Sequence, residues 1–252
     1  MIISQIIDRK QKGIKGFAVL IDSDKVEEVK DLQGLINIAI ENNVDYFFVG
    51  GSFISRNNIG LVVRKLKDNS HLPVILFPGN YNHIDSHADA ILFLSLISGR
   101  NAEYLIGQHV IAAPFLRKTS LEILPTGYML VNDHAKSSAA YVSNTIPIPN
   151  DKTEIACATA MAGEMLGMQM IYMDAGSGSE CPIPPDMISK VSKSINIPLI
   201  IGGGIRTEID AMHALKAGAD IIVVGNGIEN SKDLLINISL TVSEYNESLK
   251  VH

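Results

Sequence analysis

Short apolar runs recur along the chain and alternate with longer segments in which apolar residues are spaced three or four positions apart. This alternation is typical of buried parallel strands separated by amphipathic helices. The apolar runs predict strands at Phe17–Asp22, Val44–Val49, Pro73–Phe77, Ala90–Leu94, Glu122–Val131, Met170–Asp174, Pro198–Ile201 and Ile221–Val224. Eight strands alternating with helices, without a linker between two halves, predict one (β/α)8 TIM barrel formed by residues 1–252. A doubly wound open sheet is the alternative.

The periodic segments between the runs predict the helices of this barrel. They cover about Val26–Asn43, Ile54–Lys67, Glu103–Phe115, Thr153–Leu166, Asp186–Ser194, Thr207–Gly218 and Lys232–Leu249. Two connections differ from this scheme. The segment Tyr81–Ala88 is too short for a full barrel helix, and Ser137–Pro149, rich in hydroxyl groups and prolines, is predicted to be a loop. Pro125 and Gly127 predict a bend or a bulge in the fifth strand.

Glycines follow the last two predicted strands. Gly202, Gly203 and Gly204 end the seventh strand, and Gly225 with Asn226 ends the eighth. Glycine lets a backbone approach a ligand closely, and N–H groups at a helix N-terminus favour an anion. In (β/α)8 barrels the loops after strands seven and eight often hold a phosphate. Tight turns alone would explain one such corner, but two corners separated by one helix favour a phosphate site.

Polar residues are placed where the predicted strands end. The carboxyl ends of all barrel strands meet at one face, which is the functional face of this fold. That face collects Asp22, Ser52, Asn80, Asn132, Tyr172, Asp174 and Ser177. The Asp22 carboxylate and the Ser52 hydroxyl are hard oxygen ligands that suit Mg²⁺, with water and substrate phosphate completing its shell. A helix N-cap is an equally good interpretation of Asp22.

Asp174 is a candidate general base, because it ends a strand at this face and precedes a Gly/Ser-rich loop. A cap or loop hydrogen bond is the alternative role for its carboxylate. The spacing of His83 and His87 would suit zinc on a helix, but their surroundings resemble a loop and no third ligand is evident, so we interpret both as surface residues. His134 lies near the predicted mouth of the barrel.

Composition narrows the classes of function. The net charge of −6, without a block of basic residues, argues against nucleic acid as a partner. No apolar run approaches the ~20 residues that span a bilayer, and the first residues lack the apolar core of a signal peptide. Cys157 and Cys181 suggest neither a disulfide framework nor a metal site. We therefore expect a cytoplasmic protein without a transmembrane segment.

Eight motifs, spread over nearly the whole chain, carry a resemblance to a known family. They are VLIDSDK (Val19–Lys25), FFVGGS (Phe47–Ser52), PVILFPGN (Pro73–Asn80), ADAILFLSLI (Ala88–Ile97), YVSNTIPIP (Tyr141–Pro149), YMDAGSGS (Tyr172–Ser179), IIGGGIRT (Ile200–Thr207) and VGNGIE (Val224–Glu229). Together they resemble the geranylgeranylglyceryl phosphate synthase family, which includes the bacterial heptaprenylglyceryl phosphate synthases. The glycine-rich motif alone would not be specific, because other phosphate-binding barrels share it.

The resemblance implies a Mg²⁺-dependent prenyltransferase that joins a long-chain prenyl diphosphate, geranylgeranyl diphosphate first, to sn-glycerol 1-phosphate. This is an early step of ether phospholipid biosynthesis. By position, Asp22 and Ser52 would hold Mg²⁺, Asp174 would accept the proton of the attacking hydroxyl, and Tyr172 would orient the substrate or face the developing cation. The residues implied for glycerol 1-phosphate are Tyr172, Met173, Asp174, Ala175, Gly176, Ser177, Gly178, Gly202, Gly203, Gly225 and Asn226.

Three positions depart from the pattern of the family. Ser23 stands where one branch has proline, and Leu20 stands where another branch has lysine, so the diphosphate would depend more on Mg²⁺ or on another cation. Asp174 replaces the glutamate of many members and has a shorter reach. The prenyl tail would lie along the apolar mouth near the short third connection. A homo-oligomer and a peripheral membrane contact for the lipid product are further expectations.

Two other classes remain as alternatives. One is a different phosphate-binding TIM-barrel enzyme that acts on a sugar phosphate, and the other is a binding protein without catalysis.

Overall fold

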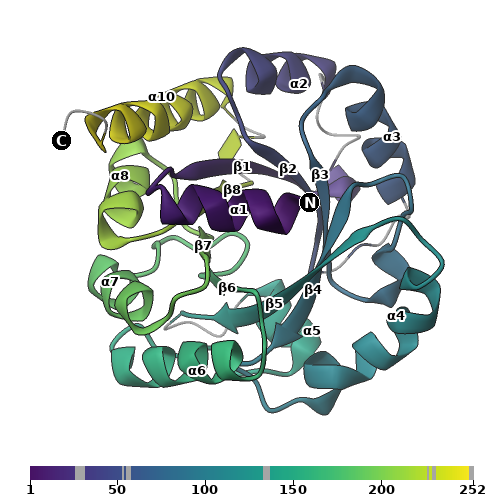
Figure 1. Cartoon of the computed structure of the whole chain (residues 1–252), viewed down its shortest axis with the longest axis vertical. Helices are drawn as coiled ribbons and strands as arrows, with labels where there is room; N and C mark the ends of the chain where they lie inside the picture. The colour runs from purple at the N-terminus through teal and green to yellow at the C-terminus, as the bar shows by residue number, and fades with distance from the viewer. Residues whose placement is uncertain are drawn as a thin grey trace.

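The computed structural model describes residues 1–25, 32–52, 54, 58–132, 137–225, 227–228 and 231–249. Its strands are β1 (Gly16–Ile21), β2 (Tyr46–Gly51), β3 (Val74–Pro78), β4 (Ala90–Leu96), β5 (Glu122–Leu130), β6 (Met170–Asp174), β7 (Leu199–Gly202) and β8 (Ile221–Val224). They are parallel and follow chain order around a closed barrel in which β8 pairs with β1 (Figure 1). The predicted (β/α)8 barrel is therefore confirmed, and the open sheet is wrong.

Helices surround the barrel and cross one of its ends. They are α1 (Ile2–Gln11), α2 (Leu32–Glu41), α3 (Ile59–Asn69), α4 (Gln108–Leu116), α5 (Ser138–Ser143), α6 (Thr153–Met165), α7 (Pro185–Ser194), α8 (Glu208–Ala217) and α10 (Lys232–Ser248). The first residues expected for the helices of residues 26–43 and 54–67 lie partly outside the described residues. As expected, the connection after β3 holds only a short 3-10 turn, Tyr81–His83.

The local structure differs from the predictions at three places. Residues 138–143 form α5 instead of a loop, because the Ser137 hydroxyl accepts the N–H of Ala140 and caps the helix. The first turn of the helix expected from Glu103 is a π-helix, Glu103–Gly107, which leads into α4. The β5 strand pairs residue for residue with β4 and with β6 through Pro125 and Gly127, so it has no bulge.

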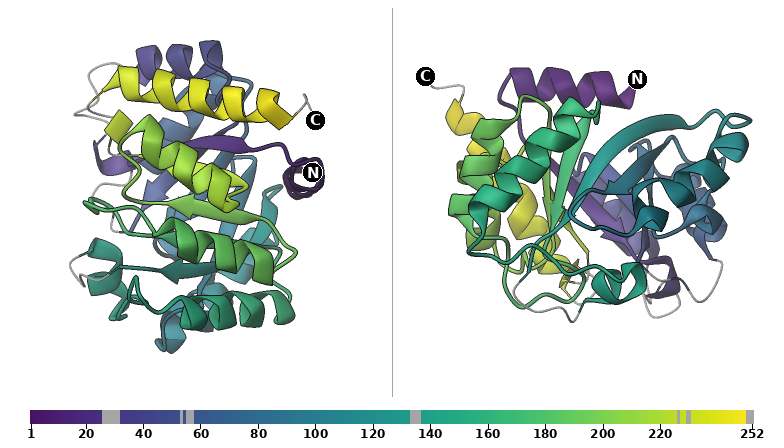
Figure 2. Two further views of the ribbon diagram at one scale, coloured as in Figure 1. Left: turned by 90° about the vertical axis from the view of Figure 1, so that its left-hand side faces the viewer. Right: turned by 90° about the horizontal axis from the view of Figure 1, so that it is seen from below.

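Helix α1, which the sequence pattern did not predict, lies across the amino end of the barrel (Figure 1). Ile2, Ile3 and Ile6 are buried against the residues that fill the barrel interior. The Glu122 carboxylate accepts the N–H groups of Ile2 at 2.5 Å and Ile3 at 3.0 Å. The cap of this helix thus comes from a distant strand, which local sequence cannot reveal. Figure 2 shows α1 and α5 at opposite ends of the barrel.

Strand residues alternate between two apolar layers. In β2, Tyr46 and Phe48 point into the barrel, whereas Phe47 and Val49 pack towards the surrounding helices. This alternation follows from the two-residue period of a strand, and it leaves both faces of the sheet buried.

The amino end of the barrel repeats one polar contact at three strand junctions. At each of these junctions an aspartate stands directly before an even-numbered strand and binds one residue near the start of the preceding strand. The backbone N–H of the aspartate donates to the carbonyl of that residue, and the carboxylate of the aspartate accepts the N–H of that residue. The pairs are Asp45 with Phe17, Asp89 with Val74 and Asp220 with Leu199. Lysine or arginine side chains pair with each carboxylate. We call this contact the aspartate clamp.

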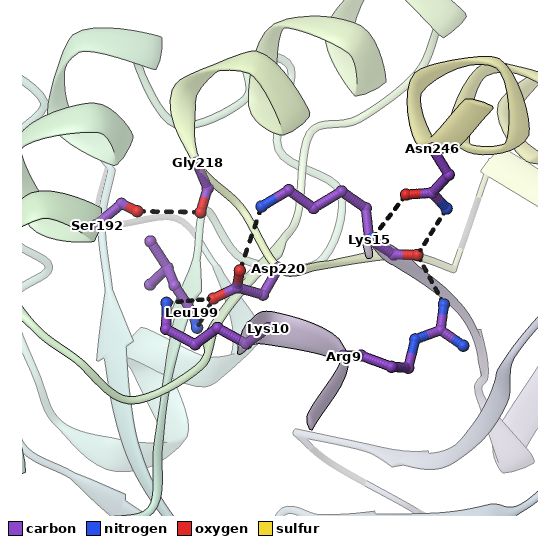
Figure 3. Close-up of polar contacts among 8 residues, drawn as sticks. All are labelled: Arg9, Lys10, Lys15, Ser192, Leu199, Gly218, Asp220 and Asn246. Carbon is purple, nitrogen blue, oxygen red and sulfur yellow. Dashed lines mark hydrogen bonds and ion pairs between the residues drawn. The ribbon is translucent and has the colours of Figure 1, made fainter. Parts of the chain in front are cut away.

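The Asp220 clamp is the most buried of these and also holds α1 (Figure 3). Its carboxylate contacts Lys10 Nζ at 2.8 Å, Lys15 Nζ at 3.2 Å and the N–H of Leu199 at 2.9 Å. Lys10 belongs to α1, so the clamp joins this helix to β7 and β8. Two cations and an amide together compensate a carboxylate that is removed from water.

The junction between β5 and β6 differs from the three clamps. Gln169 stands directly before β6 and donates its N–H to the carbonyl of Pro125 at 2.8 Å. Proline has no N–H to offer in return, and glutamine carries no charge. One half of the clamp is therefore missing at this junction.

Candidate functional site

Two adjoining cavities open at the carboxyl end of the barrel. The first, here called the polar pocket, lies among the loops after β1, β2, β6, β7 and β8. The second, the apolar groove, runs between β3, β4, the π-helix, α4 and α5. Ser52 and Phe77 line both cavities, so the pocket and the groove meet at these two residues.

Most residues predicted for the site line the polar pocket. They are Asp22, Ser52, Tyr172, Asp174, Gly176, Ser177, Gly178, Gly203 and Gly225. Met173 and Ala175 instead pack in the layer between the barrel and its helices. Gly202 lies beneath the ring of Tyr172, where no other side chain would fit. Asn226 lies outside the described residues.

Gly203 shapes the pocket because it brings two loops together. Its φ of +76° is unfavourable for residues with a side chain. A Cβ atom at this position would lie 2.5 Å from Asp174 Oδ1 and 2.8 Å from the backbone nitrogens of Ala175 and Gly176. The loop after β7 therefore touches the loop after β6 through a bare backbone.

Helix α8 begins just after this corner with a capping box. The Thr207 hydroxyl accepts the N–H of Asp210 at 3.1 Å, and the Asp210 carboxylate accepts the N–H groups of Thr207 at 3.0 Å and Arg206 at 3.1 Å. These contacts occupy N–H groups that we expected to face an anion. The loop glycines are therefore the better placed backbone groups for a phosphate.

The carboxylate of Asp174 is held at two points inside the pocket. Its Oδ1 atom accepts the N–H of Gly176 at 2.7 Å, and its Oδ2 atom accepts the hydroxyl of Tyr128 at 2.6 Å. Burial raises the pKa of Asp174, while the hydrogen bonds from Tyr128 and Gly176 oppose that rise. The loop hydrogen bond considered as an alternative role is present. The same carboxylate lines the pocket, and a raised pKa suits a general base.

Tyr128 was missed by the sequence analysis. It sits on β5 directly opposite Tyr172 on β6, and with Phe77 these two form an aromatic cluster with ring centroids 5.3–5.9 Å apart. Burial and the nearby Asp174 charge raise the pKa of both tyrosines well above its usual value, so both hydroxyls stay protonated. The alternation of side chains along β5 could have indicated Tyr128, because it places Tyr128 and Leu130 on the face that points into the barrel.

Asp22 has the capping role considered for it, and its place at the pocket leaves the metal role as a proposal. Its Oδ1 atom accepts the N–H of Asp24 at 3.1 Å, which caps the 3-10 turn Ser23–Lys25, and its Oδ2 atom lies 3.6 Å from Lys25 Nζ. Its carboxylate also faces Gly51, next to Ser52, at the edge of the polar pocket. One carboxylate and one hydroxyl fit a Mg²⁺ ion whose other ligands are water and phosphate oxygens. The described residues contain no group of three or more His, Cys, Asp and Glu side chains arranged for a metal.

Arg206 was also missed, although it belongs to the glycine-rich motif. It lines the polar pocket and donates to the carbonyl oxygens of Ser179 at 2.9 Å and Gly178 at 3.3 Å. Its guanidinium joins the loop after β7 to the loop after β6 and places a positive charge at the rim. Leu20, from the motif Val19–Lys25, lines the same pocket.

The apolar groove is lined mainly by hydrocarbon side chains, among them Phe77, Ile84, Leu92, Leu94 and Val142. The histidines near it behave differently from one another. His83 is buried and accepts the N–H of Gly79 at 3.0 Å, so its interpretation as a surface residue was wrong. His87 is exposed and pairs with Asp85 at 2.8 Å, and His134 lies outside the described residues.

Comparisons with known proteins agree with this geometry. The geranylgeranylglyceryl phosphate synthase of Spirosoma linguale is 52% identical over 242 residues, which cover 96% of this chain and 97% of that protein. The enzyme of the same name from Chitinophaga pinensis is 51% identical, covering 93% and 92%. The crystal structure of (S)-3-O-geranylgeranylglyceryl phosphate synthase from Thermoplasma acidophilum, in complex with sn-glycerol-1-phosphate, superposes with a TM-score of 0.87. It is 31% identical and covers 97% of this chain and 99% of its own.

The model of the PcrB family matches residues 9–242. With full-length relatives at more than half identity and a closed barrel of the same shape, the chain belongs to the PcrB family.

Proposed function

We propose that this protein is a prenyltransferase that forms an ether between sn-glycerol 1-phosphate and a long-chain prenyl diphosphate, in the synthesis of ether phospholipids. The observation that carries the proposal is the meeting of the polar pocket and the apolar groove at Ser52 and Phe77. A small phosphorylated alcohol and a long hydrocarbon need such adjoining cavities. Relatives named geranylgeranylglyceryl phosphate synthase support it.

The glycine loops after β6, β7 and β8 would hold glycerol 1-phosphate, the ligand of the Thermoplasma relative. Its free primary hydroxyl would face the junction of the two cavities, where C1 of the prenyl chain lies. The hydroxyl oxygen forms a bond to C1, the bond from C1 to the diphosphate oxygen breaks, and the diphosphate leaves with the electron pair. Asp174 accepts the hydroxyl proton. Holding both reactants in place removes much of the entropic barrier of a two-substrate reaction.

The aromatic cluster lies where positive charge develops on the allylic carbon. Phe77 lines both cavities, and the Tyr172 ring packs against it with centroids 5.3 Å apart. Ring faces attract a cation, so this cluster would favour the transition state over the neutral substrate.

Mg²⁺ is part of the proposal, with Asp22 and Ser52 as the residues that would hold it. When bound, the ion would neutralise the charge of the diphosphate leaving group. Asp22 supplies the anionic ligand at the edge of the pocket, and Ser52 places a hydroxyl at the junction with the groove. Leu20 brings no charge to this region.

The hydrocarbon tail would occupy the apolar groove. The 3-10 turn Tyr81–His83 replaces a barrel helix after β3 and leaves this side of the mouth to be covered by the π-helix, α4 and α5. We propose geranylgeranyl diphosphate as the donor, following the names of the relatives.

Further parts of the proposal concern the state of the protein. We propose that residues 1–252 act as one domain, that the enzyme is cytoplasmic and that it forms a homo-oligomer. No helix in the described segments is long and apolar enough to cross a bilayer. Exposed apolar side chains at Phe115, Tyr141 and Ile146 are candidates for contact with another subunit or with a membrane during product release.

The test is to incubate the protein with sn-glycerol 1-phosphate, Mg²⁺ and a panel of C15–C35 prenyl diphosphates, and to identify products by mass spectrometry. We expect the ether of geranylgeranyl with glycerol phosphate, and little product with sn-glycerol 3-phosphate. Absence of an ether with every donor would refute the proposal. Conversion of a sugar phosphate instead would favour the alternative enzyme class.

A further inference from the structure

We infer that Tyr128 is a positioning residue for the reaction, which acts by holding the Asp174 carboxylate in the orientation that receives the hydroxyl proton. The inference rests on the proposed function, because it assigns a role within that same site. None of the eight motifs that carry the family resemblance includes Tyr128.

The position of Tyr128 supports this role. Its side chain lines the apolar groove, whereas Asp174 lines the polar pocket, so the hydrogen bond between them crosses the wall that separates the cavities. Backbone pairing sets Tyr128 opposite Tyr172 and Leu130 opposite Asp174. The tyrosine thus comes from the neighbouring strand at the depth at which the reacting atoms would meet.

The hydroxyl has a task that the ring alone does not perform. The N–H of Gly176 holds Asp174 Oδ1, but a single contact leaves the carboxylate free to turn about the bond to its Cβ atom. The hydroxyl of Tyr128, 2.6 Å from Oδ2, supplies the second contact and fixes the plane of the carboxylate. Both side chains are buried, so water is a poor substitute for either partner.

The hydrogen bond also sets the protonation of Asp174. A donor to the carboxylate favours its charged form, which is the form that accepts a proton. Tyr172 on β6 is the other titratable side chain next to this carboxylate, and the charged side chains of Asp22 and Arg206 line the same pocket. Without the Tyr128 hydroxyl, a larger share of Asp174 would be protonated at a given pH.

The test is the variant Tyr128→Phe, which keeps the ring packed against Phe77 and Tyr172. We expect kcat to fall about 10- to 100-fold, the usual worth of a hydrogen bond to a charged group, while KM for glycerol 1-phosphate stays within about threefold. The acidic limb of the pH–rate profile should move to higher pH. Tyr46→Phe is the matched control, because it removes a buried tyrosine hydroxyl at the opposite end of the barrel. Its kcat and pH profile should stay unchanged.

A double-mutant cycle separates positioning from packing. If Tyr128 acts through Asp174, then Tyr128→Phe in an Asp174→Asn background should cost less than about threefold in kcat. An equal loss in both backgrounds, or an unmoved acidic limb, would overturn the inference.

A readout without turnover keeps the two proposals distinguishable. Carbon-13 NMR of labelled aspartate carboxyl groups, with Asp174→Asn to assign the signal, reports the titration of Asp174 directly. A rise of its pKa in Tyr128→Phe supports the contact, and an unchanged pKa overturns it. If the wild-type protein makes no ether, the proposed function fails, whereas this titration still decides whether Tyr128 controls Asp174.

Discussion

Gly203→Ala tests the close approach of the two loops that form the polar pocket. The substitution introduces two costs. The φ of +76° is worth roughly 1–2 kcal/mol for a residue with a Cβ atom. The new methyl group would also start 2.5 Å from Asp174 Oδ1, so the carboxylate or the loop must move by about 0.5 Å or more. A displacement of this order at reacting atoms lowers turnover by about 10- to 100-fold.

The matched control is Gly167→Ala, at the end of α6. Its φ of +91° imposes the same kind of backbone cost, but no atom outside its own neighbours lies within 4 Å of the new methyl group. Both variants should lose roughly 2–8 °C in melting temperature, measured by differential scanning fluorimetry. Gly203→Ala alone should lose turnover, measured as ether formation, and affinity for glycerol 1-phosphate, measured by calorimetry. Wild-type turnover in Gly203→Ala, with stability lowered as in the control, would refute the reasoning.

Three further substitutions test separate parts of the structure. Burial raises the pKa of Asp174, so its ionised form opposes folding at neutral pH. Asp174→Asn should therefore raise the melting temperature at pH 7.5 and lose that advantage below about pH 4. The same variant should lower kcat about 10²–10⁴-fold, whereas Asp174→Glu should keep measurable activity. Asp22→Asn should keep the fold and need more Mg²⁺ for half-maximal turnover, and an unchanged Mg²⁺ dependence would leave Asp22 only its capping role. Asp220→Asn leaves the half-buried Lys10 and the buried Lys15 without a full counter-charge and should cost about 3–5 kcal/mol of stability in a denaturant titration. Turnover per folded molecule should not change in Asp220→Asn. An unaltered free energy of unfolding would show that the Asp220 clamp does not contribute to stability.

The sequence predicted the barrel because its signals are local. Each buried strand is a short apolar run, and the Thr207 capping box and Gly218 mark the ends of α8 in the sequence itself. The strand order then follows from chain order, and the glycine corners fall at the carboxyl end. The pocket residues Asp22, Ser52 and Asp174 were located by the same reasoning.

Two of the misses, α1 and Tyr128, share one physical cause, which is a partner distant in sequence. Helix α1 depends on a cap from Glu122, about 120 residues away. Tyr128 gains its significance only when β5 pairs with β6 and brings it to Asp174. The burial of His83 has a local cause instead, because Gly79 and Asn80 in the same short loop fold back onto its ring, and the residue types of the loop do not reveal that turn. Local periodicity predicts elements, but the contacts between elements depend on register.

The incomplete clamp between β5 and β6 has a consequence for hydrogen exchange. Three junctions are fastened at the amino end by an aspartate, whereas this junction has Gln169 and Pro125 there and is tied at the other end by Tyr128 and Asp174. Local opening begins where fewest contacts must break. The amides at the amino end of the β5–β6 pair should therefore exchange with solvent deuterium sooner than the amides at the amino ends of the three clamped pairs. The bond that orients the Asp174 carboxylate would then also hold β5 to β6 at the carboxyl end, next to a junction that lacks the aspartate at its amino end.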